Sequence, residues 1–250
     1  MDTEPSADPK LRDSESVSGM FARIAPSYDR INRAMCFGLD VLWRKKLVRS
    51  VKECVGSNGI EILDCACGSG DVCLELSRSI LGASIIGIDF CPQMLAAAKE
   101  KAAKYAPHSK IEFLNGDCCA LPFEDSRFDA ATIAFGFRNF NGRRKCLEEI
   151  ARVLKPGGLL AILEVARAGG IFAFFQRVFM CGAVPAIAKI FGGRREDYKY
   201  LAHTTMDYPH NPEVMRILES AGFSMVKIAP MAFGMVALNT AQKKREDDSE

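Results

Sequence analysis

The residues best suited to chemistry lie at positions 63–71, where the sequence reads Leu-Asp-Cys-Ala-Cys-Gly-Ser-Gly-Asp between an apolar run and a helical pattern. Small residues at such a point, here Gly68 and Gly70, let a ligand approach the backbone closely. The turn by itself is a weak signal, because it serves NAD, FAD, adenosylmethionine or only a tight connection. Cys73 stands where the dinucleotide fingerprint has its third glycine, which disfavours a pyrophosphate ligand.

Two carboxylates follow at spacings that suit an adenosine ligand. Asp89 comes roughly 20 residues after the glycines, at the end of the second expected strand, where it can accept hydrogen bonds from both ribose hydroxyls of NAD or adenosylmethionine. Asp117 lies just past the third expected strand, where a carboxylate can accept from the adenine amino group. Strand termination is the alternative for Asp117, and capping is an equal alternative for Asp64. The residues expected to bind adenosylmethionine are Asp64, Gly68, Ser69, Gly70, Asp89, Asp117, Cys118 and Ala134.

The elements that position these residues follow from the spacing of apolar side chains. Short apolar runs alternate with helical patterns, which is typical of an α/β fold with a mostly parallel sheet and helices on both faces. Strands are expected at residues 60–65, 84–89, 111–115, 128–135, 159–165, 223–228 and 233–239, and helices at 39–51, 72–80, 92–105, 143–154 and 212–221. Residues 155–158, Lys-Pro-Gly-Gly, are expected to form a turn before the fifth strand.

We expect one domain, residues 17–240, between two tails. Residues 1–16 combine Asp, Glu, Ser and Pro with few large apolar side chains, so we expect them to be disordered, and residues 241–250 form a charged tail. Residues 17–55 carry apolar side chains at helical spacing and are expected to form a helical lid. Residues 166–210 interrupt the alternation of strands and helices and are expected to form an insertion.

Composition narrows the possible partners. Thirty-three basic and 31 acidic residues leave a formal charge of +2, which does not indicate a nucleic-acid surface. The N-terminus has no apolar leader, so the ten cysteines do not indicate a secreted disulfide scaffold. Their spacing and the presence of only three histidines do not indicate a metal site either. We therefore expect reduced thiols, no metal and a cytosolic protein.

Several motifs outside the glycine turn are more selective. They are Tyr28-Asp29-x-x-Asn32, Leu42-Trp43-Arg44, Ala120-Leu121-Pro122-Phe123, Phe135-Gly136-x-Arg138-Asn139, Arg152-Val153-Leu154-Lys155-Pro156-Gly157-Gly158 and Tyr198-x-Tyr200-Leu201. With these motifs the sequence resembles the ubiquinone/menaquinone biosynthesis C-methyltransferase family from Phe21 to Asn239. The resemblance implies a Rossmann-like class I methyltransferase with a seven-stranded sheet, adenosylmethionine as the methyl donor, and a demethylated isoprenoid quinol as the acceptor.

Two positions depart from the family pattern. Ser69 replaces the usual threonine and keeps its hydroxyl, whereas residues 201–206, Leu-Ala-His-Thr-Thr-Met, replace the common Leu-Ala-Glu-Ser-Ile. The second change leaves the details of the acceptor pocket open. We prefer demethylmenaquinol to the ubiquinone precursor as the acceptor. The alternatives are a methyltransferase for another small hydrophobic or phenolic acceptor, a nicotinamide-dependent oxidoreductase, and a donor-binding protein without activity.

Methylation of a quinol carbon requires that an adjacent hydroxyl lose its proton, because this loss shifts electron density onto the ring. Asp71, after the glycine turn, and Arg138 and Asn139, just past the fourth strand, are expected at the carboxyl edge of the sheet, where ligands bind. We expect Arg138 and Asn139 to stabilise the forming oxyanion, while Asp71 orients a water molecule or accepts the proton. The alternative is an Arg138–Asp71 ion pair that braces the loop.

The lid is expected to complete the pocket through Tyr28, Asp29 and Asn32, with a helix cap and a core tyrosine as the alternative. His203 and His210 are weaker candidate bases, because a histidine in a polar insertion is more often a surface residue.

The insertion contains the apolar segment 171–191, which Gln176, Arg177 and Lys189 interrupt, so we expect no membrane span. We expect an amphipathic element that contacts a membrane and admits the isoprenoid tail, with an ordinary buried helix pair as the alternative. The expected partners are therefore a lipophilic quinol and a membrane surface, while homodimerisation is left open. The expected location is the cytoplasm, either free or at the inner face of the membrane.

Overall fold

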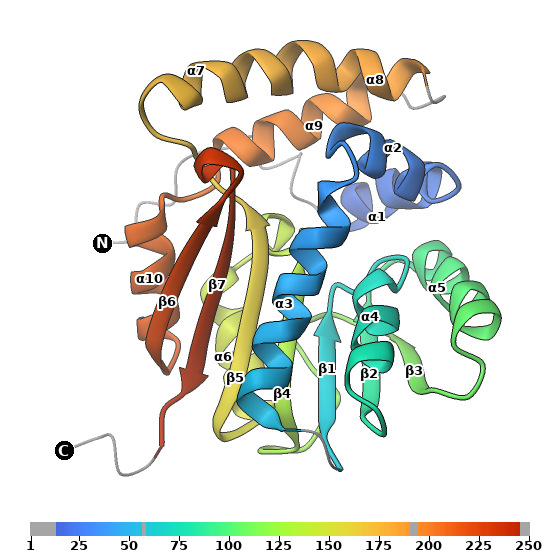
Figure 1. The fold of residues 1–250 in the computed structure, drawn as a ribbon, viewed down its shortest axis with the longest axis vertical. Coiled ribbons are helices and arrows are strands. Elements are labelled where there is room, and N and C mark those ends of the chain that lie inside the picture. Colours follow the sequence, from blue (N-terminus) through green and yellow to red (C-terminus); the bar gives the residue numbers. More distant parts are fainter. Residues whose placement is uncertain (1–13, 57–58, 191–194, 246–250) are drawn as a thin grey trace.

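The computed structural model describes residues 14–56, 59–190 and 195–245 (Figure 1). Most of the expected N-terminal tail and half of the C-terminal tail therefore lie outside the described residues. The boundaries of both tails shift, because helix α1 (Ser14–Ile24) begins inside the first and strand β7 (Val236–Lys243) extends into the second.

A seven-stranded sheet with the strand order β3-β2-β1-β4-β5-β7-β6 forms the centre of the molecule (Figure 1). Its other strands are β1 (Glu61–Cys65), β2 (Ser84–Asp89), β3 (Lys110–Asn115), β4 (Phe128–Ala134), β5 (Leu154–Val165) and β6 (Phe223–Met231). Strands β1 to β5 are parallel, and β7 lies antiparallel between β5 and β6. The α/β fold expected from the sequence is confirmed.

Helices cover both faces of this sheet. On one face lie α3 (Leu39–Val55), α4 (Asp71–Ser79) and α5 (Pro92–Tyr105), and on the other lie α6 (Arg143–Val153) and α10 (Asn211–Ser220) (Figure 1). Each face has its own hydrophobic cluster, which includes Leu47, Val72 and Leu95 on the first face and Leu147 and Val214 on the second. Burial on both faces explains why the central parallel strands read as nearly continuous apolar runs.

The order of the strands determines where a ligand can bind. β1 pairs with β2 on one side and with β4 on the other, so that Cys65 lies beside both Ile88 and Ile133. The chain thus reverses its direction of strand addition at β1, and such a reversal leaves a crevice beyond the carboxyl ends of the strands. The glycine turn after β1 and the loop after β4 both lie at this crevice.

Two strand predictions need correction. Strand β5 already begins at Leu154, and the expected turn Lys-Pro-Gly-Gly is a bulge within it, since the pairing with β4 jumps from Phe128↔Leu154 to Ala130↔Leu159. The last strand was expected from residue 233 but begins at Val236. Phe233 has φ +56° in the short helix η4 (Ala232–Gly234), a conformation that interrupts a strand.

The lid and the insertion pack together above the carboxyl edge of the sheet. The expected lid comprises α1, α2 (Tyr28–Met35) and α3; α1 and α2 lie above this edge, whereas α3 continues along the face of the sheet. The insertion comprises α7 (Gly170–Val178), the π-helical turn η3 (Phe179–Ala183), α8 (Val184–Ile190) and α9 (Arg195–Met206). Ile31 and Met35 of the lid share a hydrophobic cluster with Met180, Val184 and Ala202 of the insertion. These two parts of the chain therefore form one roof over the crevice (Figure 1).

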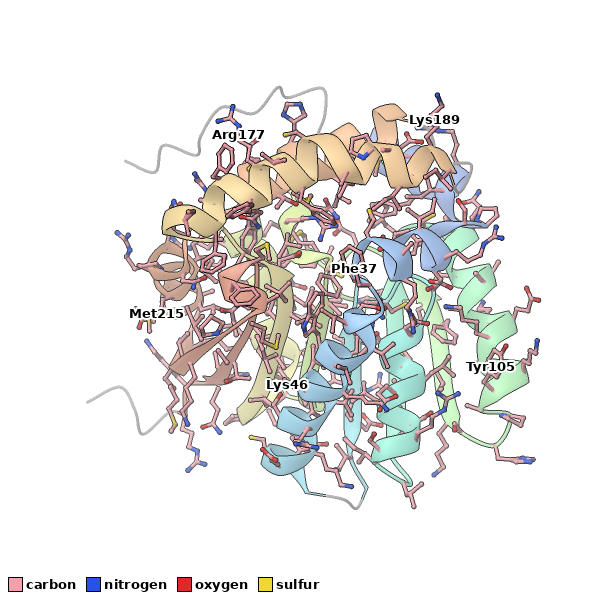
Figure 2. The ribbon with its side chains drawn as sticks, turned by 45° about the horizontal axis from the view of Figure 1, so that its top comes forward. Phe37, Lys46, Tyr105, Arg177, Lys189 and Met215 are labelled. Atoms are coloured by element: carbon pink, nitrogen blue, oxygen red, sulfur yellow. A yellow bond between two sulfur atoms is a disulfide. The ribbon has the colours of Figure 1, made fainter. Side chains whose placement is uncertain are left out.

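The insertion contains one long apolar helix, which corrects the expectation that no segment could span a membrane. Gly170–Ile190 form 21 helical residues with a hydropathy of 1.7, which is sufficient to cross a membrane by length and composition alone. One side of this helix, however, packs against the lid and α9 through Met180, Val184 and Ala188. The opposite side is exposed, and Arg177 and Lys189 project from it (Figure 2).

Candidate active site

Three neighbouring cavities lie at the crevice and share lining residues. The first has a volume of about 350 Å³ and lies between the glycine turn, the end of β2 and helix α1. The large cavity, of about 640 Å³, lies between the lid and the insertion. A small junction of about 30 Å³ lies beside the glycine turn. Tyr28 and Phe135 line all three cavities, so these residues mark the point where the cavities meet.

Asp89 connects the first cavity to the glycine turn. Its carboxylate accepts the backbone N–H of Gly68 at 2.8 Å and that of Cys91 at 2.9 Å. Burial raises the pKa of Asp89, although these N–H donors oppose the shift. Gly68 and Asp89 both line the first cavity, and each carboxylate oxygen can accept a further hydrogen bond from a ligand.

The other expected donor-binding residues divide into three groups. Asp117, Cys118 and Ala134 line the first cavity, and Asp117 also accepts the backbone N–H of Cys119 at 2.9 Å. Asp64 and Ser69 line the junction instead. Gly70 lines none of the three cavities. A Cβ at Gly70 would lie 3.0 Å from the Ala98 side chain, which indicates that this glycine serves helix packing.

Asp64 is a buried acceptor beneath the junction. It accepts the hydroxyl of Thr132 at 2.7 Å and the thiol of Cys73 at 3.2 Å. Burial raises its pKa to about 6, against the effect of these two donors. Asp64 therefore supports the end of β1 from below, as well as lining the junction.

The backbone is strained where the cavities meet. Ala66 and Phe135, which directly follow β1 and β4, have φ values of +52° and +58°, a region that side chains with a Cβ rarely adopt. Both residues line the first cavity and the junction. Strained residues gather at functional sites, so this observation points to the same edge of the sheet as the cavities do.

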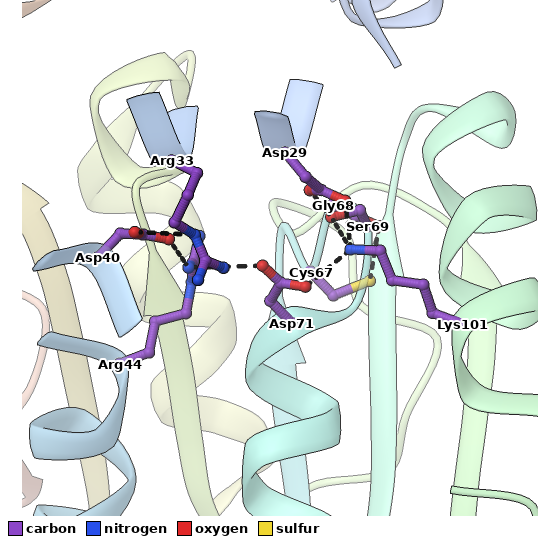
Figure 3. Close-up of polar contacts among 9 residues, drawn as sticks. All are labelled: Asp29, Arg33, Asp40, Arg44, Cys67, Gly68, Ser69, Asp71 and Lys101. Carbon is purple, nitrogen blue, oxygen red and sulfur yellow. Dashed lines mark hydrogen bonds and ion pairs between the residues drawn. The ribbon is translucent and has the colours of Figure 1, made fainter. Parts of the chain in front are cut away.

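Asp71 belongs to a network of ion pairs that joins α2 and α3 to the helices α4 and α5 (Figure 3). Lys101 of α5 donates to its carboxylate at 2.7 Å, and Arg44 of α3 lies 3.4 Å from the other oxygen. Burial alone would raise the pKa of Asp71, but the charges of Arg44 and Lys101 hold it below its usual value. The alternative Arg138–Asp71 pair is wrong, because Arg138 pairs with a different residue.

Arg138 instead braces the end of β5. Its Nη1 donates to Glu164 Oε1 at 2.6 Å and to the carbonyl oxygen of Phe135 at 2.6 Å, while its backbone N–H donates to Glu164 at 3.0 Å. Burial would lower the pKa of Arg138, but the charge of Glu164 raises it above its usual value. Arg138 lines the large cavity, and its buried Nε has no hydrogen-bond partner within the described part of the chain.

Asn139 lies on a different cavity from Arg138. It lines the first cavity, and its side-chain oxygen accepts the hydroxyl of Tyr200 at 3.3 Å. The two residues are adjacent in the short 3-10 helix η2 (Phe137–Asn139), where consecutive side chains point about a third of a turn apart. The expectation that both residues face one oxyanion therefore does not match their placement.

The three lid candidates have distinct positions. Tyr28 lines all three cavities, and burial raises the pKa of its hydroxyl, although the charge of Arg138 opposes the shift. Asn32 lines the large cavity. Asp29 accepts the hydroxyl of Ser69 at 2.6 Å and pairs with Lys101 at 2.5 Å, so it ties the lid to the glycine turn (Figure 3).

Sequence reasoning missed the cations of this network. Neither Arg44 nor Lys101 was predicted to belong to the site. Their partners lie far away in the chain, so no local pattern identifies them. His203 and His210, the weaker candidate bases, are exposed and line none of the three cavities.

The first cavity suits adenosylmethionine. Gly68, with φ +53°, brings its backbone to the cavity wall, and Asp89 stands beside it with free acceptor capacity. The fold places this cavity at the switch point of the sheet, where such ligands bind. Fold and site together define a Rossmann-like class I methyltransferase that uses adenosylmethionine as its methyl donor.

The family follows from the sequence. Residues 10–243 match the model of the ubiE/COQ5 methyltransferase family, and the chain belongs to this family. It is 39% identical to a demethylmenaquinone methyltransferase of Thermus thermophilus over 90% of this chain and 100% of that protein. A protein of the same name from Bacteroides fragilis is 34% identical over 92% of this chain and 93% of its own length.

Solved structures confirm the fold. A SAM-dependent methyltransferase from Aquifex aeolicus matches with a TM-score of 0.61 and 22% identity, covering 86% of this chain and 96% of that one. A SAM-dependent methyltransferase from Thermotoga maritima, a possible histamine N-methyltransferase, matches with a TM-score of 0.63 and 18% identity. The match covers 91% of this chain and 100% of that one.

Proposed function

We propose that the enzyme methylates a ring carbon of a demethylated isoprenoid quinol, with demethylmenaquinol as the acceptor. The observation that carries this proposal is the large cavity, whose volume of about 640 Å³ is walled mainly by apolar side chains of the lid and the insertion. It meets the first cavity at Tyr28 and Phe135, so an acceptor ring there would face the donor. The names of the relatives at 39% and 34% identity support the same acceptor.

The residues of this chain then divide the work. The bound donor supplies a methyl group on a positively charged sulfur. Asp89 holds its ribose, Asp117 accepts from its adenine, and Gly68 lets it approach the backbone. Tyr28 and Phe135 exclude water where the two ligands meet, so that the reacting atoms are held close in a dry site.

We assign Arg138 the role of stabilising the oxyanion of the acceptor, because this positively charged residue lines the large cavity. Asp71 lines only the junction, and its lowered pKa makes it a weak base. We therefore assign Asp71 an orienting role through Arg44 and Lys101 rather than proton acceptance. The hydrogen that the methyl group replaces leaves as a proton to water. Asn139 contributes to the donor side of the site.

The proposal is tested by incubating the protein with methyl-labelled adenosylmethionine and reduced acceptors. We expect label in the product of a demethylated naphthoquinol with an isoprenoid tail, and less with the matching benzoquinol. The fully methylated naphthoquinol is the control and should take up no label. Equal labelling of a simple phenol, or no labelling of either quinol, would contradict the proposed acceptor.

The exposed side of the long apolar helix supports a peripheral membrane contact. Ile171, Phe174, Phe175 and Val178 are each more than half exposed, and this side carries no acidic residue within the described part of the helix. Phe175 and Val178 also line the large cavity. An apolar face with Arg177 at its border suits the interface of an anionic bilayer, from which a lipophilic quinol could enter the cavity directly.

Replacing Phe174 and Phe175 by serine should weaken binding to anionic liposomes at least about tenfold, because two exposed aromatic side chains no longer enter the bilayer. Activity on a long-tailed quinol should fall with it, whereas the affinity for adenosylmethionine should not change. Vesicle sedimentation and calorimetry measure these effects. Leu81→Ser is the matched control, since Leu81 is 78% exposed at the opposite end of the sheet. A dimer that becomes monomeric with unchanged vesicle binding would show that a second copy covers this face.

A further inference from the structure

We propose that Arg44 of α3 binds the carboxylate of the donor's methionine portion and thereby selects donors with an intact amino-acid end. The inference rests on the placement of the adenosine portion at Asp89 and Asp117 proposed above. It adds a residue of the lid to the donor site, and it gives the ion-pair network a function in ligand recognition.

The charges around the donor single out Arg44. Among the described residues that line the first cavity and the junction, it is the only one with a positive charge. The same walls contain four aspartates: Asp64, Asp71, Asp89 and Asp117. Adenosylmethionine ends in an ammonium group and a carboxylate, so the aspartates can attract the ammonium group, and the carboxylate requires a cation.

The junction lies where the methionine portion must pass. With the adenosine at Asp89, the sulfur has to lie near Tyr28 and Phe135, because the methyl group must reach the large cavity there. The rest of the methionine portion then extends along Gly68 into the junction, which has Arg44 in its wall. Arg44 lines the large cavity as well, so it stands beside the transferred group without blocking it.

Arg44 is held in place but keeps donors to spare. Its Nη1 contacts Asp40 at 2.5 Å and Asp71 at 3.4 Å, and its guanidinium lies 5.9 Å from the ring centre of Phe135. Its Nε and Nη2 make no hydrogen bond with any residue that the structure describes. Arginine binds carboxylates through two parallel N–H groups. Because Asp40 occupies only Nη1, the Nε and Nη2 groups of Arg44 can bind a carboxylate in this way.

A ligand carboxylate on Nε and Nη2 of Arg44 would not have to displace the Nη1 contacts with Asp40 and Asp71. Asp71 keeps its closer partner Lys101 at 2.7 Å, so an incoming carboxylate would leave no aspartate without a counter-charge (Figure 3). Asp40 is buried and also pairs with Arg33, so it stays in place and anchors Arg44. Donor binding would thereby engage α3.

The test compares donors that differ only in this end. Binding of adenosylmethionine, of decarboxylated adenosylmethionine and of 5′-methylthioadenosine is measured by calorimetry in the wild type, Arg44→Gln and Arg44→Lys. We expect Arg44→Gln to bind adenosylmethionine about tenfold or more weakly. Its affinity for the two ligands without a carboxylate should stay within about twofold of the wild type. The affinity of Arg44→Lys for adenosylmethionine should lie between those of the wild type and Arg44→Gln, because lysine keeps the positive charge but lacks the two parallel N–H groups.

Arg33→Gln is the matched control, because Arg33 pairs with the same Asp40 but lines none of the three cavities. It should keep the preference of the wild type for a carboxylate. An Arg44→Gln protein that weakens all three ligands equally, or that keeps the preference, overturns the proposal. If Arg44→Gln does not fold, the proposal is judged on Arg44→Lys, which should show a reduced preference for adenosylmethionine over the two ligands without a carboxylate. Failure of the acceptor proposal cannot mimic these outcomes, since no quinol is present.

Discussion

Replacing Arg138 by glutamine is expected to lower the single-turnover rate of methyl transfer by about a hundredfold or more. A cation that stabilises the developing oxyanion acts more strongly in the transition state than in the bound complex. The affinities for donor and quinol should therefore change much less than the rate. Rapid-quench measurements with saturating donor and acceptor give this rate, and direct binding measurements give the affinities.

The contacts of Arg138 also support a second hypothesis, in which this residue only braces the end of β5. Arg138 pairs with Glu164 at 2.6 Å and holds the carbonyl oxygen of Phe135, so its loss also leaves the buried Glu164 without its cation. A bracing role predicts a lower melting temperature and activity that recovers on cooling. Glu164→Gln is the matched control, because it weakens the brace and keeps the cation.

The two roles also differ in their response to pH. If Arg138 lowers the cost of forming the oxyanion, raising the pH should partly restore the rate of Arg138→Gln, because more of the acceptor hydroxyl ionises without assistance. A purely structural defect has no such dependence. Near wild-type single-turnover rates in folded Arg138→Gln protein would rule the catalytic role out.

Replacing Asp89 by alanine is expected to weaken adenosylmethionine binding at least about tenfold, because each charge-assisted hydrogen bond to a ribose hydroxyl contributes roughly 1.5–3 kcal/mol. Asp89 is only 5% exposed, and it also accepts the N–H groups of Gly68 and Cys91. The substitution should therefore loosen the glycine turn in addition to removing the proposed ribose contact. Calorimetry measures the affinity, and thermal unfolding measures the structural part.

The choice of ligand separates Asp89 from Arg44. 5′-Methylthioadenosine keeps the ribose but lacks the amino-acid end, so Asp89→Ala should weaken it as much as adenosylmethionine. Asp89→Asn keeps one acceptor oxygen and the shape of the side chain, so its affinity for adenosylmethionine should lie between those of Asp89→Ala and the wild type. Unchanged donor affinity in folded Asp89→Ala protein would show that the ribose binds elsewhere.

Elements with a strong local pattern were predicted well from the sequence. Helix α5 was expected and found at residues 92–105, and strand β2 at 84–89, because a helix-initiating proline and a short β-branched run each identify their own boundaries. The start of β5 was missed because Gly157, with φ +78°, lies in a bulge that pairing with β4 creates. A turn motif alone does not show whether it interrupts a strand or bends it.

By itself, the sequence determined the fold class, the family and the identity of the methyl donor, since these depend on apolar periodicity and on motifs whose residues are close in the chain. The residues that hold the donor stay a prediction. Only the tertiary structure decided which charges meet. In the structure, Arg138 pairs with Glu164, and Asp71 pairs with Lys101 and Arg44. Arg138 and the adjacent Asn139 line different cavities. The physical reason is that an ion pair depends on distance in space, and chain folding brings together residues that are 26 or 30 positions apart.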